Sequence, residues 1–140
     1  MDETAYRNAR GGINRLPCVF EKALLLGCAA CALALRHALA ERETLACADP
    51  AAHADCRAFH RLLREKSQFA LKLGAAEERI PHAKEMKLQC GGLRGLQEAL
   101  GKPLDVHLLV HGADIPELPY SRIIQGVAAW QGRRRSGADA

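Results

Sequence analysis

From Pro17 to Leu45 the chain reads PCVFEKALLLGCAACALALRHALAERETL. Alanine and leucine, which are strong helix formers, supply most of this stretch. Apolar residues recur at spacings of three and four, as they do along one face of a helix, and Pro17 suits a first helical turn. Gly27 weakens a helix, but at a tolerable cost. The pattern therefore predicts one long helix over residues 17–45.

A second helix is predicted directly after this stretch. Asp49 can cap its first turn and Pro50 fits its first position. The apolar periodicity continues to about Leu73, and Gly74 provides a stop. Because the connection is short, we expect the two helices to form an antiparallel hairpin.

The second half of the chain predicts two more helices. One begins near Pro81 and buries its leucines, and the last spans Tyr120 to about Trp130. Gly91-Gly92 is unusual inside a helix and predicts a kink, or a place where something bulky approaches the backbone. Residues 104–110 are expected to form a short strand or an extended connector.

Length and composition set the class of fold. The chain has 140 residues, of which 49% are hydrophobic and only 4% aromatic. This length accommodates one domain with a core of its own. We therefore expect an all-α fold, a small bundle of about four helices built on the hairpin. The helical domain is expected over residues 13–132, between a flexible lead-in over 1–12 and a basic, disordered tail over 133–140.

The charge pattern limits the partners. The formal net charge is +4, but lysine and arginine are interleaved with acidic residues, as on ordinary solvated helix faces. Only Arg133–Arg135 forms a basic run, and few aromatic side chains are present to stack on bases. Nucleic-acid binding is therefore not expected.

The uncharged stretch Ala23–Leu35 raises the question of a membrane segment or an export signal. It is shorter than the roughly 20 residues that a membrane-spanning helix requires. The acidic residues that precede it are atypical of a signal peptide. We expect a cytoplasmic protein without a membrane segment. Structural disulfides are rare in that compartment, so the thiols are expected to be buried or to bind a metal.

The candidate functional residues are the six cysteines: Cys18, Cys28, Cys31, Cys47, Cys56 and Cys90. Four of them follow the spacing Cys28-x2-Cys31-x15-Cys47-x8-Cys56. Thiolate is a soft, anionic ligand, and zinc and iron–sulfur clusters are usually held by four such donors. The spacing therefore predicts a cysteine-ligated metal or cluster site.

The expected helices indicate which cysteines can meet. Cys28 and Cys31 share one face of the first helix. Cys47 lies in the connecting loop, and Cys56 points inward from the second helix. These four cysteines are the predicted ligands. Cys18 fits worst, because about 15 Å of helix would separate it from Cys28.

Cys90 is the first substitute ligand. On the third helix it would lie at about the same level as Cys28 and Cys31. The two glycines that follow it would leave room for a cluster.

A cysteine-only ligand set in an alanine-rich pocket favours a [4Fe–4S] cluster. Zinc is the alternative, since His53 and His60 share a helix face with Cys56 and zinc often takes histidine. Two other interpretations stay open: cysteines that only fill the core, and disulfide or thiol redox chemistry.

The predicted function is that of an iron–sulfur protein in electron transfer, in redox sensing, or as an accessory subunit. Its expected partner is a protein, such as a redox enzyme or a larger complex. The alternative is a zinc-stabilised or metal-free helical interaction module. No acid, base and nucleophile set converges in the sequence, so an enzymatic activity of its own is not favoured. His107 and His111 are expected to have structural or surface roles.

Overall fold

The fold was obtained as a computed structural model, which describes residues 16–74, 79–103 and 105–132. In chain order, the elements within these ranges are α2 (Glu21–Leu26), β1 (Ala34–Leu39), β2 (Arg42–Cys47), α3 (Pro50–Lys66), α4 (His82–Met86), the π-helix η1 (Lys87–Gly91), α5 (Gly92–Leu100), α6 (Val106–Val110), the 3-10 helix η2 (Ile115–Glu117) and α7 (Tyr120–Ala129).

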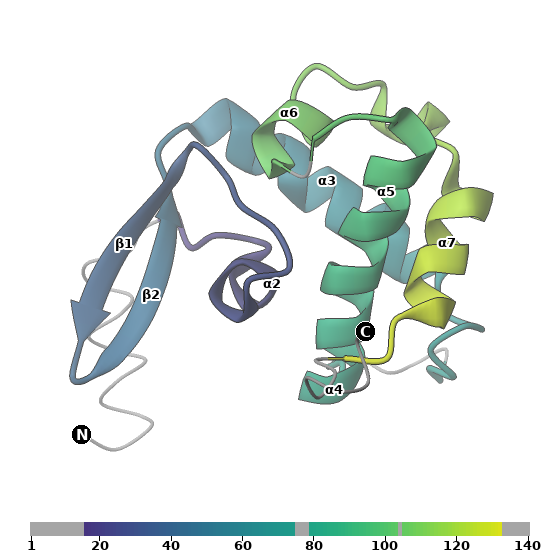
Figure 1. Ribbon diagram of the computed structural model, residues 1–140, viewed down its shortest axis with the longest axis horizontal. Coiled ribbons are helices and arrows are strands. Elements are labelled where there is room, and N and C mark those ends of the chain that lie inside the picture. The colour runs from purple at the N-terminus through teal and green to yellow at the C-terminus, as the bar shows by residue number, and fades with distance from the viewer. Residues whose placement is uncertain (1–15, 75–78, 104, 133–140) are drawn as a thin grey trace, which may run out of the picture.

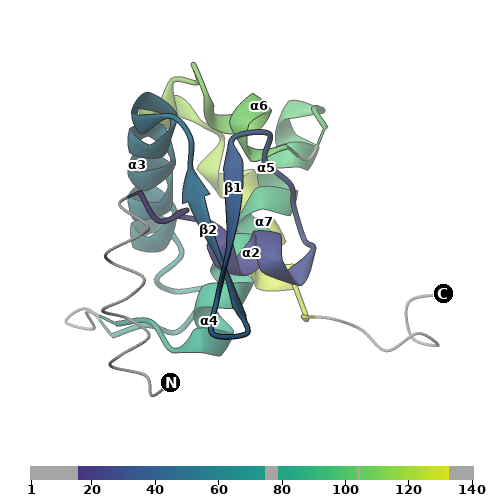
Figure 2. The same cartoon turned by 90° about the vertical axis from the view of Figure 1, so that its left-hand side faces the viewer.

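The β-hairpin stands at one end of the molecule beside α2, and α5 and α7 pack side by side at the other end (Figure 1). Helix α3 runs between these two ends and contacts α6, α7 and β2. Seen from the hairpin end, α2 and the two strands lie in front of the helices (Figure 2). The largest fully buried side chains come from all these parts: Phe20, Leu45, Phe59, Leu63, Leu88, Leu93, Leu96, Leu109, Val110, Ile123 and Val127.

The all-α prediction is wrong, because the predicted long first helix is broken into a short helix, a loop and a hairpin. Gly27 ends α2 in the left-handed conformation, with a φ of +88°. The N–H groups of Gly27 and Cys28 bond back to the carbonyls of Leu24 and Ala23, at 3.2 and 2.9 Å. This arrangement is a common helix stop, in which glycine accepts a conformation that other residues avoid.

Strands β1 and β2 pair as an antiparallel hairpin, with Ala34 opposite Cys47 and Leu39 opposite Arg42. The two turn residues, Ala40 and Glu41, have φ of +51° and +68°. Two-residue hairpin turns need such values, and asparagine or glycine usually supplies them. The sequence lacks that turn signal, and its Ala-Leu alternation fits both a helix and a strand, so the hairpin was not predicted.

Helix α3 confirms the predicted start of the second helix. Asp49 caps it, with Oδ1 accepting the N–H of Ala51 at 3.0 Å, and Pro50 takes the first position. The helix ends at Lys66, several residues before the predicted end at Leu73. The predicted antiparallel helix hairpin does not form, because the chain before α3 is the β-hairpin.

The third helix begins after Pro81, as predicted, and continues through η1 and α5 to Leu100. At Gly91 and Gly92 the helix passes from a π-helical segment into α5, and a Cβ on Gly91 would lie 2.6 Å from the carbonyl oxygen of Gly126 in α7. The predicted close approach at the glycines is therefore confirmed, and what approaches is another helix.

The last part of the chain gives one wrong prediction and one correct one. The segment expected to be a strand or connector forms α6, which Asp105 caps by accepting the N–H of His107 at 3.0 Å. Helix α7 occupies Tyr120–Ala129, as predicted to within one residue.

No helix in the described ranges has the length and apolar character needed to cross a membrane. The predicted lead-in over residues 1–12 and the predicted basic tail over 133–140 lie outside the described residues.

Candidate functional site

Four cysteines from four different segments line one small cavity. Cys18 precedes α2, Cys31 lies in the loop between α2 and β1, Cys47 ends β2, and Cys56 lies on α3; all four are half-buried thiols outside any disulfide. The cavity has a volume of about 20 Å³, which is room for roughly one water molecule. Three of the four predicted ligands, and Cys18 in place of Cys28, therefore face a common space.

Cys18 and Cys47 are brought together by backbone pairing along the outer edge of β2. The N–H of Cys18 bonds to the carbonyl of Leu45 at 2.9 Å, and the N–H of Cys47 bonds to the carbonyl of Leu16 at 2.8 Å. The segment before α2 thus acts as a third, short strand-like neighbour of β2. Pro17 lies opposite Ala46 in this antiparallel pairing, so Cys18 and Cys47 lie diagonally across from each other on the same face.

Cys31 is held by the loop that follows α2. The N–H of Val106 donates to the carbonyl of Ala30 at 2.8 Å, so the start of α6 fastens this loop. Burial raises the pKa of Cys31, and the backbone N–H groups of Leu33 and His107 oppose that rise. Such N–H donors stabilise a thiolate and are a means by which proteins tune metal–sulfur centres.

Cys56 reaches the cavity from the second turn of α3, as predicted. One turn earlier on the same helix, the ring Nε2 of His53 lies 2.9 Å from the carbonyl oxygen of Pro17. This contact ties α3 to the segment that carries Cys18. His53 lines the cavity, but the nitrogen that faces Pro17 is already used.

The walls of the cavity carry no aspartate, glutamate, lysine or arginine among their described lining residues. Burial is the main cause that raises the pKa of Cys18 to about 11. The neighbouring thiols of Cys31 and Cys47 contribute to this rise, and the Phe20 N–H opposes it. Burial, followed by the charges of Cys18, Cys31 and Cys47, raises the pKa of Cys56 to about 12. Cys18 and Cys56 therefore hold their protons at neutral pH unless a cation replaces them.

The remaining two cysteines form a disulfide that joins Cys28 to Cys90, with Cα atoms 5.6 Å apart. Cys90 was expected at about the same level as Cys28, and the two residues do meet, although the long first helix assumed in that prediction does not form. Neither residue lines the thiol cavity. The predicted ligand Cys28 and the predicted substitute Cys90 are thus placed outside the group of four thiols.

The structure places the histidines in different surroundings. His60, expected on the same face as Cys56, bonds instead to Glu85 at 2.8 Å. His107 lines the cavity, and its Nδ1 is buried without a hydrogen-bond partner among the described residues. From the sequence, His107 was expected to have a structural or surface role. Asp105 can cap a helix that begins with the next residues, and this is the sequence signal that would have placed His107 in a helix.

The thiols stand around the cavity and do not meet at one point. In the parts of the chain that the structure describes, no three histidine, cysteine or acidic side chains are close enough to hold one ion. What the arrangement offers chemically is four sulfur donors from separate segments, in apolar surroundings, with N–H groups directed at some of the sulfurs.

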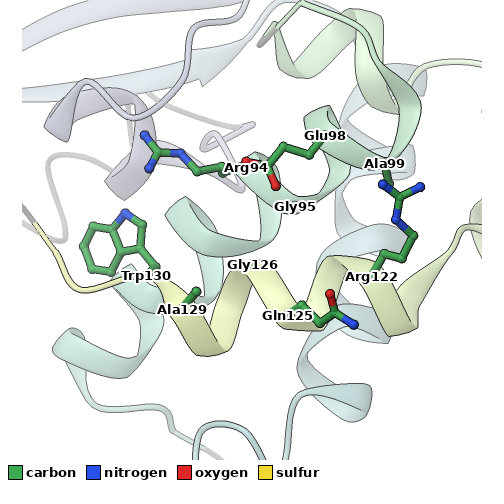
Figure 3. Close-up of a pocket in the computed structure, with 9 residues that line it drawn as sticks. All are labelled: Arg94, Gly95, Glu98, Ala99, Arg122, Gln125, Gly126, Ala129 and Trp130. Atoms are coloured by element: carbon green, nitrogen blue, oxygen red, sulfur yellow. The ribbon is translucent and has the colours of Figure 1, made fainter.

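A larger groove of about 400 Å³ lies between α5 and α7, away from the hairpin end (Figure 3). Arg94 and Trp130 stand at one end of it and Arg122 at the other, over a floor of small residues. It is open to solvent and carries none of the cysteines.

Comparisons with protein-family profiles, with curated proteins and with solved structures found no match to this chain. A function therefore has to be argued from the chain's own geometry.

The raised thiol pKa values predict how the metal-free protein responds to alkali. Thiols of the unfolded chain ionise near 9.0, whereas Cys18 and Cys56 in the fold ionise near 11 and 12. The unfolded state therefore loses protons first, and the stability present below pH 9 is lost as the pH rises toward 11.

Urea unfolding of the chelator-treated protein at pH 8 and pH 10.5 measures this loss. The Cys18→Ala/Cys56→Ala variant is the control, because it shares every other titrating group. We expect a smaller difference in unfolding free energy between the two pH values for the variant. An equal difference would contradict the assigned pKa shifts.

Proposed function

We propose that this chain is a cysteine-ligated iron–sulfur protein, with a [4Fe–4S] cluster held by Cys18, Cys31, Cys47 and Cys56. It acts in the cytoplasm, in electron transfer, in redox sensing or as an accessory subunit that docks to a protein partner. The observation that carries the proposal is the convergence of four thiols, from four separate segments, on one cavity without charged walls. The ligand set differs from the sequence prediction by Cys18 in place of Cys28.

The donor chemistry supports a metal–thiolate centre. Four thiolates are the usual ligand set of [4Fe–4S] clusters and of structural zinc. The backbone N–H groups directed at Cys18 and Cys31 would set the reduction potential of a cluster, and the apolar walls would shield it from water. When bound, the cluster supplies one-electron chemistry, and the chain supplies the sulfur ligands and the low-dielectric surroundings.

The placing of the thiols around the cavity favours a cluster over a single ion. A single zinc ion needs its sulfurs about 2.3 Å from one point, whereas a cluster takes one thiolate at each of four irons. In the described ranges no three such donors are placed to hold one ion, so a single zinc ion would require the segments that carry the four thiols to move.

A zinc-stabilised interaction module is the second candidate, and the cavity size favours it. A space of about 20 Å³ admits a single ion, whereas a cluster requires the loops that carry Cys18 and Cys31 to move outward. In this alternative the ion joins the hairpin, α2 and α3, and the chain works by binding a partner.

Anaerobic purification followed by metal and sulfide analysis tests the proposal. We expect a brown protein with a broad absorption near 400 nm and about four iron and four sulfide per chain. A colourless protein with about one zinc per chain would establish the second candidate. A protein that contains neither metal, and takes up neither on reconstitution, would contradict both.

A further inference from the structure

The groove between α5 and α7 shares no lining residue with the thiol cavity. Its volume of about 400 Å³ lies within the range of small-molecule pockets, roughly 300–1,000 Å³. Gly95 and Gly126 form part of its floor, and a Cβ on Gly126 would lie 2.8 Å from the Cα of Gly95. Because this floor is backbone packed on backbone, the groove is formed before any ligand enters.

The charged side chains of the groove are Arg94, Glu98 and Arg122, and all three are exposed. Toward the part of the chain that the structure describes, none of them forms a side-chain hydrogen bond or an ion pair. A guanidinium group without a partner is a ready donor to a phosphate or carboxylate. With two arginines against one glutamate, the groove favours an anionic ligand.

The aromatic side chain of the groove is Trp130, which is half-buried at the end of α7. Figure 3 shows Arg94 beside its indole ring and Arg122 at the opposite end of the groove. An indole face and a guanidinium plane both stack on planar rings. Trp130 follows Arg122 by eight residues, or about 12 Å along a helix. A ligand that uses both ends is therefore elongated, with a ring at one end and an anionic group at the other.

A hydrogen-bond acceptor lies between these two ends. Figure 3 shows the Glu98 carboxylate between the guanidinium groups of Arg94 and Arg122. Carboxylates in this role bind ribose hydroxyls in dinucleotide sites. The carboxamide of Gln125 lies on the Arg122 side of the groove and can donate to an anion. Stacking surface, carboxylate and cation thus follow in the order of base, ribose and phosphate.

We propose that this groove binds a nucleoside monophosphate. The base stacks on Trp130 beside Arg94, and Glu98 accepts hydrogen bonds from the ribose. Arg122 and Gln125 donate to the phosphate. The scarcity of aromatic residues that argues against nucleic-acid binding does not apply here, because a single nucleotide needs one stacking ring and one phosphate site. The proposal is independent of the function proposed for the thiol cavity.

The fluorescence of Trp130 tests the proposal on the full chain, because this is its single tryptophan. Adenosine monophosphate should quench the fluorescence saturably, with half-saturation below about 1 mM. Adenosine, which lacks the phosphate, and inorganic phosphate, which lacks the base, should each bind at least about 10-fold more weakly. Equal binding of adenosine or of inorganic phosphate, or no saturable quenching by the nucleotide, would overturn the proposal.

Variants assign the two ends of the ligand, with isothermal titration calorimetry as a second readout. Arg122→Ala should weaken binding of adenosine monophosphate by about 10-fold, the loss of one charge-assisted hydrogen bond, and leave adenosine binding unchanged. Arg57→Ala is the matched control, since it removes the same charge from an exposed position on α3 outside the groove. Equal weakening in both variants would reduce the effect to general charge attraction and contradict the site.

Glu98→Ala tests the ribose contact by the sign of its effect. If Glu98 binds the ribose, its loss should weaken binding of adenosine monophosphate. If the carboxylate only repels the phosphate, its loss should strengthen binding, and that result would overturn the assigned orientation of the nucleotide.

Discussion

Replacing Cys56 by serine should weaken binding of the metal centre and leave the fold in place. Cys56 lies on α3 and faces the cavity, and serine is tolerated within a helix. Loss of one of four thiolates removes about a quarter of the 10–16 kcal/mol typical of a structural thiolate site, or about 3 kcal/mol. Affinity should therefore fall by roughly 100-fold, as measured by metal content after gel filtration and by competition with a chelator.

Cys28→Ser is the control outside the cavity; it also breaks the Cys28–Cys90 disulfide and frees the Cys90 thiol. It should keep a full complement of metal when metal is in excess. Cys18→Ser separates the structural ligand set from the set predicted by sequence, since Cys18 belongs only to the former. Loss of metal in Cys28→Ser, with full retention in Cys18→Ser, would contradict the cavity assignment and restore the sequence-based set.

Sequence reasoning about the positions of the cysteines depended on the first helix, which the structure does not contain as predicted. Cys18 was set aside because a continuous helix would place it about 15 Å from Cys28. The chain instead turns at Gly27 and again at Ala40 and Glu41, and so brings Cys18 back beside Cys47 on β2. One wrong secondary-structure assignment therefore changed which four cysteines were expected to face a common space.

The parts of the fold that local signals define were predicted well. Helix α3 begins with the Asp49 cap and Pro50, a start signal that can be recognised in the sequence. Pro81 likewise precedes the third helix. The hairpin has no such signal, because its turn uses Ala40 and Glu41 where asparagine and glycine are usual. Its place in the fold depends on tertiary contacts: Glu21 in α2 accepts the Thr44 hydroxyl at 2.9 Å and the Leu45 N–H at 2.8 Å. Such contacts override the helix propensity of a stretch rich in alanine and leucine.

The glycines of the second half carry the packing of the other end of the molecule. Gly91 and Gly95 lie one turn apart and face Gly126 across the crossing of the third helix and α7. A Cβ on Gly126 would lie 2.6 Å from the carbonyl oxygen of Gly91 and 2.8 Å from the Cα of Gly95. Backbone thus meets backbone here, and Gly95 and Gly126 also line the groove between α5 and α7 (Figure 3).

Replacing Gly95 by alanine should destabilise the protein, although the same change in an open helix stabilises it by roughly 0.5–1 kcal/mol. The new Cβ would lie 2.6 Å from the carbonyl oxygen of Ile123 and 2.9 Å from its Cα, and backbone cannot rotate away as a side chain can. The helices must separate, so overpacking should cost about 1–3 kcal/mol and lower the midpoint of thermal unfolding by roughly 3–10 °C.

Arg94→Ala, an exposed change on the same helix, is the control and should stay within about 0.5 kcal/mol of the parent. Trp130, the single tryptophan of the chain, packs beside Gly91, so its fluorescence reports the loss of this contact directly. A Gly95→Ala protein that is more stable than the parent would contradict the close crossing of the third helix and α7.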